Sequence, residues 1–267
     1  EYDINMLAMP GVNYATHPLI ANAGIDMCED RGDAFFIMDL NTVDASVNTA
    51  ISNVSGLDTN YAAVYYPWIK VLDSSTNVPV MVPPSVVVPG AIAQSDRLQA
   101  EWFAPAGLNR GILGNVLEAK IRLNQQERDK LYDAKINPIA TFPQTGVCIW
   151  GQKTLQERST ALDRINVRRL LITLKKFIGS SSKYLVFEQN TDETRIRFLN
   201  IVNPYLESVQ QKQGLFAFRV QMDESNNTPD VIDRNQLVGA IYLQPTKTAE
   251  FIVLDFNVLP TGATFPS

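Results

Sequence analysis

The sequence is poor in the side chains that most often carry out catalysis or bind metals. It contains one histidine, His17, and two cysteines, Cys28 and Cys148, which stand far apart and lack a CxxC partner. A zinc site of the usual kind, or a Ser-His-Asp triad, would therefore depend wholly on His17. We interpret His17 as a structural or surface residue at a loop-to-helix junction, and both cysteines as buried free thiols.

Several longer motifs are also missing from the sequence. No GxGxxG, GxxxxGK[ST] or GxSxG string occurs, and GILGN at Gly111 predicts only a turn. No apolar run reaches the roughly eighteen residues of a membrane-spanning helix, so we expect no membrane insertion. The chain opens EYDINMLAMPG, which has no initiator methionine and no signal-peptide pattern. We expect a fragment or a processed product of a longer chain.

Positive charge is in deficit overall. The 23 Lys and Arg residues face 28 Asp and Glu residues, for a net charge of −5. A general nucleic-acid-binding surface needs a basic field, so we expect no direct contact with nucleic acid. Hydrophobic residues make up 45% of the 267 positions, which is enough for a substantial core in one large domain or two smaller ones.

Strand and helix patterns alternate through the first hundred residues. We predict strands over 4–11, 33–41 and 60–73, and helices over 17–32, 42–56 (with Thr42 as a possible N-cap) and 90–103, with a Pro-rich loop over 77–90. This order predicts a mainly parallel, layered α/β sheet. The turn-rich connector 104–115 is our candidate boundary, which gives an α/β domain over 1–107 and a second domain over 108–267.

The second domain has an α+β pattern, with helices expected to pack on a mixed sheet. We predict helices over 124–137, 162–178 and 191–213, and strands over 145–155, 215–223, 237–245 and 249–259. The helix 124–137 should close at Asn137-Pro138, and Pro204 should kink or restart the helix 191–213. A long polar loop separates the strands 215–223 and 237–245.

One segment, LDRINVRRLLITLKKFI (162–178), concentrates positive charge in this acidic chain. Its apolar residues form one helical stripe, and we expect its charged residues to project away from the docked face: Arg164, Arg168, Arg169, Lys175 and Lys176. No acidic residue occurs between Arg164 and Lys176, so no ion pair forms along the helix itself. A solvated face is the simple interpretation, but a facing acidic surface, on this protein or another, explains the pattern better.

Two aspartates allow an enzymatic alternative. Asp39 ends a predicted buried strand and Asp44 follows five residues later, and ligand-binding residues collect at the carboxyl ends of strands in α/β sheets. A small α/β hydrolase or a carboxylate-metal enzyme centred on Asp39, with Asp44 and His17, is therefore conceivable, although helix-capping and turn roles are commoner. Convergence of these side chains in one pocket would distinguish the two.

Several strings, in one order, resemble the tail sheath proteins of contractile bacteriophage tails and related injection devices. They are YYPWIKVLD, VPPSVVVPGAIAQSDRLQAEWFAPAGLNRGIL, LDRINVRRLL, SSKYLVFEQN, NNTPDVIDRNQLV and IYLQPTKTAEFIVLDF. The resemblance is densest to the sheath of T4-like myophages, runs from about Tyr61 to Phe256, and is weaker over the first sixty residues.

The resemblance implies a structural role without enzymatic activity or a cofactor. The chain would be the C-terminal part of a sheath subunit, with its second domain in the inner layer. Such subunits form hexameric rings stacked helically around a tail tube, alongside baseplate and tail terminator proteins. The implied location is the virion tail, assembled in the bacterial cytoplasm.

Two surfaces are then candidate interfaces. The basic helix would contact an acidic face of the tube or of an adjacent subunit. The final predicted strand, with Phe251, Val253 and Asp255 on one face, would offer an edge for pairing with a neighbour. Contraction would be a switch between two packings. A third interpretation is a structural or adhesion module of some other assembly.

Overall fold

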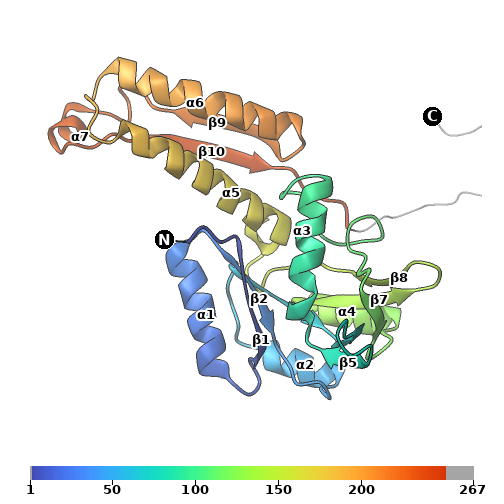
Figure 1. Cartoon of the computed structure of the whole chain (residues 1–267). Coiled ribbons are helices and arrows are strands. Elements are labelled where there is room, and N and C mark those ends of the chain that lie inside the picture. Colours follow the sequence, from blue (N-terminus) through green and yellow to red (C-terminus); the bar gives the residue numbers. More distant parts are fainter. Residues whose placement is uncertain (1, 251–267) are drawn as a thin grey trace, which may run out of the picture.

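The structure of the protein, a computed structural model, describes residues 2–250. These residues form two parts (Figure 1): a sheet unit over residues 2–155, and a C-terminal unit over residues 165–250 that extends from it as a long arm. Within the described range, no helix has both the length and the apolar character needed to cross a bilayer. The predicted final strand, including Phe251, Val253 and Asp255, lies largely outside the described residues.

The sheet unit is built on one five-stranded sheet of order β1-β2-β3-β7-β8. Its strands are β1 (Met6–Asn13), β2 (Phe35–Asp39), β3 (Ala62–Tyr66), β7 (Ile136–Phe142) and β8 (Gly146–Ile149). The first four strands run parallel, and β8 joins β7 antiparallel. Every residue of β2 and β3 is buried, as expected for strands covered on both faces. The prediction of a mainly parallel α/β sheet is confirmed.

Three helices of the sheet unit show how local sequence sets their ends. In α1 (Pro18–Arg31) the proline occupies the first turn and Gly32 ends the helix at φ 66°, as predicted. In α2 (Val47–Val54) the cap is Ser46, whose hydroxyl accepts a hydrogen bond from the Thr49 amide. The predicted start at Thr42 is therefore wrong. In α4 (Gln125–Asp133) the Asn124 and Glu127 side chains form a capping box.

The strand predicted over 60–73 is divided in two. Pro67 follows a cis peptide bond and separates β3 from β4 (Ile69–Leu72), because proline has no amide hydrogen for a strand ladder. A second sheet has the order β5-β4-β6, with β5 (Pro79–Val82) and β6 (Val116–Ala119) on either side of β4. The Pro-rich segment that we expected to be a loop therefore holds β5, the short helix η1 (Pro84–Val86) and the start of α3 (Val88–Leu98).

The main sheet draws strands from both sides of residue 107, where we expected a boundary. Ile136 of β7 pairs with Val64 of β3, so a strand from beyond the connector completes the sheet. Asn137 and Pro138 lie within β7, which corrects their predicted position at a helix end. The buried Asn137 amide donates to the carbonyl oxygens of Val64 and Lys153, and these hydrogen bonds hold it in the sheet.

The C-terminal unit packs two long helices against a two-stranded sheet. Its elements are α5 (Ile165–Ser182), α6 (Asp192–Gln211), α7 (Pro229–Asp233), β9 (Leu215–Gln221) and β10 (Ala240–Pro245), with the short helix η3 (Lys183–Leu185) after α5. The short helix η2 (Ala161–Asp163) lies just before α5, in the connection between the units. Strands β9 and β10 pair antiparallel. Helix α6 continues through Pro204 and does not restart there. The predicted polar loop between β9 and β10 contains α7.

Helix α5 belongs to two hydrophobic cores at once. Ile165 and Ile172 pack in the cluster on the α3 side of the main sheet. Leu170 and Leu174 pack with α6 and β9 in the core of the C-terminal unit. The opposite face of the sheet has its own cluster beneath α1 and α2. Because α5 contributes to both neighbouring cores, it fixes the C-terminal unit to the sheet unit.

Candidate functional site

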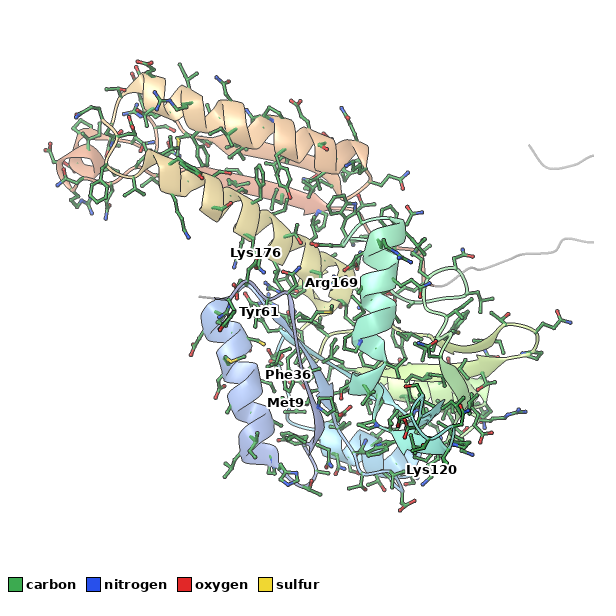
Figure 2. The ribbon with its side chains drawn as sticks, in the orientation of Figure 1. Met9, Phe36, Tyr61, Lys120, Arg169 and Lys176 are labelled. Carbon is green, nitrogen blue, oxygen red and sulfur yellow. The ribbon has the colours of Figure 1, made fainter. Side chains whose placement is uncertain are left out.

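The basic helix α5 meets acidic partners within this chain. Figure 2 shows Arg169 and Lys176 at the junction between α5, α3 and the start of the chain. Its apolar stripe docks as predicted, with Val167, Leu170 and Leu174 buried. The basic side chains then divide into a buried pair, two half-buried residues and one exposed residue. Each group has different surroundings and is described in turn.

Arg169 is held in a two-pronged ion pair across the seam between the units. Its Nη1 and Nη2 donate to the two carboxylate oxygens of Asp96 at 2.8 and 2.5 Å, and Asp96 lies on α3. Arg169 is 4% exposed and Asp96 is 21% exposed, so the pair is largely shielded from water. A bidentate arginine–carboxylate pair fixes orientation as well as distance. The pair therefore ties α5 to α3.

Two further basic residues tie α5 to the ends of the described chain. The Lys176 ammonium donates to the Asp3 carboxylate at 2.6 Å and to the Ile4 carbonyl at 2.7 Å. The Arg164 guanidinium contacts Glu250 at 2.7 Å. Arg164 also pairs with Asp163, and Glu250 accepts hydrogen bonds from Tyr132 and Gln152. These contacts place acidic partners on this protein for part of the basic helix.

Arg168 has an aromatic neighbour in place of an acid. Its guanidinium carbon lies 4.1 Å from the centre of the Tyr61 ring, and its side chain is 4% exposed. Burial lowers the pKa of Arg168, and its Nε has no hydrogen-bond partner in the part of the chain described. The expectation that all five charges project away from the docked face is therefore wrong for Arg168 and Arg169. Of the five, Lys175 is the one that is exposed.

Asp39 has a structural role inside the sheet unit, where it accepts hydrogen bonds from Ser85. The Ser85 amide and hydroxyl donate to its two carboxylate oxygens at 3.0 and 2.5 Å, which links the end of β2 to η1. Burial raises the pKa of Asp39 to about 6, although the hydrogen bonds from Ser85 act in the opposite direction. A carboxylate whose oxygens are both occupied in this way is a structural bridge between β2 and η1.

The other members of the enzymatic alternative have separate surroundings. Asp44 is exposed and pairs with Lys120, and His17 is exposed and contacts the Thr16 hydroxyl through its Nδ1 at 2.7 Å. No group of three or more histidine, cysteine or acidic side chains suited to a metal ion is present among residues 2–250. Cys28 and Cys148 are buried free thiols, as predicted, and burial raises the pKa of each to about 11.

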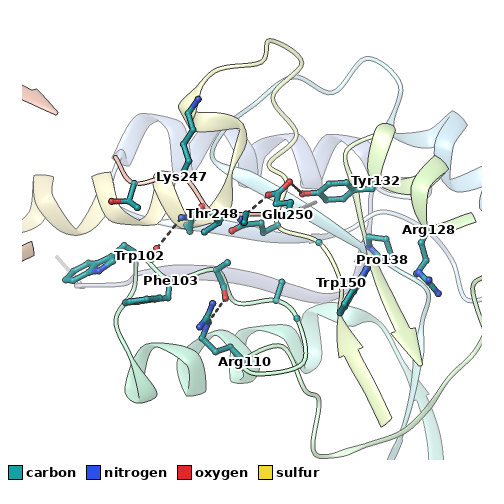
Figure 3. Close-up of a pocket in the computed structure, with 18 of the residues that line it drawn as sticks. Trp102, Phe103, Arg110, Arg128, Tyr132, Pro138, Trp150, Lys247, Thr248 and Glu250 are labelled. Atoms are coloured by element: carbon teal, nitrogen blue, oxygen red, sulfur yellow. Dashed lines mark hydrogen bonds between the residues drawn. The ribbon is translucent and has the colours of Figure 1, made fainter. Parts of the chain in front are cut away.

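A pocket of about 460 Å³ lies along the seam between the two units (Figure 3). Its walls include Trp102, Phe103 and Trp150 from the sheet unit and the segment 246–250 that follows β10. Arg110 lies over the Phe103 ring and donates to the Ala104 carbonyl. None of Asp39, Asp44 and His17 lines this pocket, so it does not bring the proposed catalytic set together.

The partners of the basic helix were not found from the sequence. Asp96, Glu250, Asp3 and Tyr61 each stand more than seventy positions from the α5 residue they contact. The one available signal was the absence of acidic residues within the helix, which predicts a facing acidic surface but not which residues form it. Those residues come together only in the tertiary fold.

Family models match nearly the whole chain. The phage tail sheath protein central domain matches residues 1–155, and the phage tail sheath C-terminal domain matches residues 157–258. The point where the two models meet lies after β8 and before α5.

Individual relatives agree with the family models. The tail sheath protein of Enterobacteria phage T4 is 38% identical over 213 residues, which are 80% of this chain and 32% of that protein. The tail sheath protein of Vibrio phage KVP40 is 36% identical over 223 residues, or 84% of this chain and 33% of that protein. The chain therefore spans about a third of the length of the curated relatives it matches.

Solved structures agree as well. The PVC sheath complex of an extracellular contractile injection system, in its contracted state, matches 96% of this chain and 71% of that chain, with a TM-score of 0.83 and 28% identity. The helical sheath of the anti-feeding prophage, also contracted, matches 95% of this chain and 69% of that chain, with a TM-score of 0.79 and 26% identity. The chain belongs to the phage tail sheath protein family.

Proposed function

We propose that this chain is part of a structural subunit of a contractile tail sheath. The subunit polymerises as helically stacked hexameric rings around a tail tube, and the polymer contracts to drive the tube through the host envelope. Its partners are neighbouring sheath subunits, the tube protein, and the baseplate and terminator proteins. It assembles in the bacterial cytoplasm and remains in the virion tail.

The observation that carries this proposal is the extent of the match to sheath assemblies. The similarity to the contracted PVC sheath covers 96% of this chain, and so includes both units, with a TM-score of 0.83. The enzymatic alternative has no comparable support, since Asp39 bridges to Ser85 and Asp44 pairs with Lys120. A structural subunit without enzymatic activity is the simplest function for this arrangement.

The proposed mechanism is a change of neighbours by a rigid subunit. Contraction is a switch between an extended and a contracted packing, in which the contracted packing has the lower free energy. The driving energy is stored at assembly, so no nucleotide and no cofactor is required. The ion pairs Arg169–Asp96 and Lys176–Asp3 hold the two units in one arrangement and support movement as one body.

Strand addition is the proposed link between neighbours. Among residues 2–250, strands β9 and β10 pair only with each other, so we propose their outer edges as the sites of strand addition. A strand edge is a template for pairing with another chain, and each backbone hydrogen bond gained contributes a net of about 0.5–1.5 kcal/mol. An arm of a neighbour on one of these edges would hold subunits together while other contacts exchange. The face with Phe251, Val253 and Asp255 stays a candidate for this role.

Fewer basic residues of this helix are free to contact a partner than the sequence predicts. Arg164, Arg169 and Lys176 are engaged by acids of this chain and Arg168 by Tyr61, so Lys175 is the residue of the five that we propose for contact with an acidic face of the tube or an adjacent subunit. An exposed pair contributes only about 0–1 kcal/mol, so this contact sets orientation more than strength.

Electron microscopy of the whole sheath subunit, expressed with and without its tube protein, tests the proposed function. We expect tubular polymers, and sheathed tubes when both proteins are present. Monomers alone under both conditions, or a chain that turns over a small molecule at a defined cleft, would contradict it.

A further inference from the structure

Helix α1 is apolar on both of its faces. Its inner face, with Ala21, Gly24, Ile25 and Cys28, packs on the sheet. Its outer face carries a second apolar row, the α1 stripe, which consists of Leu19, Ile20, Ala23 and Met27. Leu19 is 83% exposed, and Ile20 and Met27 are also exposed. A contiguous exposed apolar row of this kind is typical of a contact surface, so this outer face suits a partner.

Acidic side chains border the α1 stripe. Asp26, Glu29 and Asp30 are exposed along the same helix. Arg31 is the only basic residue in α1, and it pairs with Asp33 at 2.8 Å. The stripe therefore combines apolar contact area with net negative charge, and a partner for it needs apolar and basic side chains together.

The opposite combination occurs at the outer end of α5. The η3 patch, which consists of Tyr184, Val186 and Phe187, is strongly exposed. Phe187 is fully exposed and has a φ of 71°, which places it in the left-handed region that favours glycine. Lys175 and Lys183 are exposed on the same stretch. A fully exposed aromatic ring at this backbone position suits a residue that becomes buried in an assembly.

The two surfaces carry opposite charges: Lys175 and Lys183 lie beside the η3 patch, and Asp26 and Asp30 lie beside the α1 stripe. The η3 patch lies at the far end of the arm from the junction where α5 meets the sheet unit, whereas α1 flanks that unit (Figure 1). The α1 stripe and the η3 patch are therefore separate surfaces of one chain.

We propose that the η3 patch of one subunit docks on the α1 stripe of a second copy, with Lys183 facing Asp26 and Lys175 facing Asp30. This inference rests on the proposed function and names the adjacent subunit, in preference to the tube, as the acidic partner of Lys175. A contact between two different surfaces of identical subunits is heterologous, and repetition generates rings or open helices. That is the type of contact a helically stacked sheath requires.

Cysteine cross-linking in the whole sheath subunit tests this contact, because Cys28 and Cys148, the two cysteines of this chain, are buried. The double variant L19C/F187C, treated with a short bismaleimide during assembly, should give a ladder of covalent dimers, trimers and longer products. Each single variant should give no ladder, since one thiol per subunit cannot join more than two chains. The double variant L117C/F187C is the matched control, because Leu117 is also exposed but lies on β6.

A charge swap adds a second readout. Asp26→Lys in the L19C/F187C variant should lower the ladder yield about fivefold, the expected size for loss of an exposed ion pair. Lys183→Glu in the same chain should restore it. Polymers that form without the ladder, or a ladder equally strong with L117C, would overturn the contact but leave the proposed function standing. A cross-link from F187C to a cysteine introduced on the outer surface of the tube protein would also overturn it. Failure of the unaltered subunit to polymerise would count against the proposed function itself.

Discussion

Arg169 and Asp96 form a two-pronged ion pair although they are 73 positions apart in the chain. The pair joins α5, the first long helix of the C-terminal unit, to α3 of the sheet unit. Ile165 and Ile172 of the same helix pack into the sheet unit beside it. The positive charge of Arg169 on α5 therefore stabilises the contact between the two units of this chain.

Removal of the Arg169 charge should destabilise the fold. Arg169→Gln leaves the Asp96 carboxylate without its partner at a largely shielded site, and we expect a loss of about 2–4 kcal/mol in the free energy of unfolding. Urea denaturation of the chain measures this loss. The matched control is Lys175→Gln on the exposed side of the same helix, which should change stability by about 0.5 kcal/mol or less. Equal effects of the two substitutions on the free energy of unfolding would contradict a stabilising role for the Arg169–Asp96 pair.

Two glycines in helices should respond in opposite ways to alanine. A Cβ at Gly24 would lie 2.7 Å from the Met9 methyl and 2.9 Å from the Phe36 ring, whereas a Cβ at Gly179 would meet nothing within 4 Å. Gly24→Ala should therefore destabilise the fold by about 1 kcal/mol, since overpacking outweighs the gain in helix propensity. Gly179→Ala should stabilise it by about 0.5–1 kcal/mol. Thermal unfolding of both variants measures the difference, and a stabilising Gly24→Ala would show that α1 does not approach the sheet this closely.

Asp39 should make stability fall as pH rises. Its pKa is raised from 3.8 to about 6 in the folded state, so the folded chain binds the proton more tightly than the unfolded chain between these values. The free energy of unfolding should therefore fall by an amount on the order of 3 kcal/mol as pH rises from about 4 to 6, with no further fall above that range.

Asp39→Asn isolates this contribution because the amide does not titrate. Relative to the unaltered chain, the variant should gain stability between pH 4 and pH 7, measured by urea denaturation at each pH. A stability difference that stays constant across this range would contradict the raised pKa.

Much of the layered fold follows from local sequence. The apolar run at 35–39 became the fully buried β2, and Pro18 and Gly32 mark the ends of α1. The misplaced elements depend on contacts that local patterns do not contain. Asn137 is buried in β7, where its amide donates to the backbone carbonyls of Val64 and Lys153, and these contacts outweigh the local turn signal of Asn-Pro.

Less of the candidate site could be predicted from the sequence. The sequence predicts the basic helix and places its charges on the solvent side, whereas the fold buries Arg168 against Tyr61 and Arg169 against Asp96. A helical wheel assigns faces relative to one docking surface only. Helix α5 packs against two units, so residues beyond the apolar stripe are covered as well.

Charge reversal should distinguish the α5 residues that stabilise the fold from those that contact other subunits. Lys175→Glu should leave the unfolding free energy nearly unchanged but slow polymerisation of the whole subunit, because an exposed charge affects association more than folding. Arg168→Glu should lower stability, because it places an unpaired acid beside Tyr61 in a buried site. Light scattering during assembly and urea denaturation measure the two effects. Normal assembly kinetics for Lys175→Glu would remove this residue from the interface.

We expect the subunit to move as one rigid body while it exchanges neighbours. Cryo-electron microscopy of the same polymer before and after contraction tests it most directly. We predict that residues 2–250 superpose as one body in both states, with the Arg169–Asp96 pair intact, while contacts between subunits differ. A change in the angle between the sheet unit and the C-terminal unit, with that pair broken in either state, would contradict the claim.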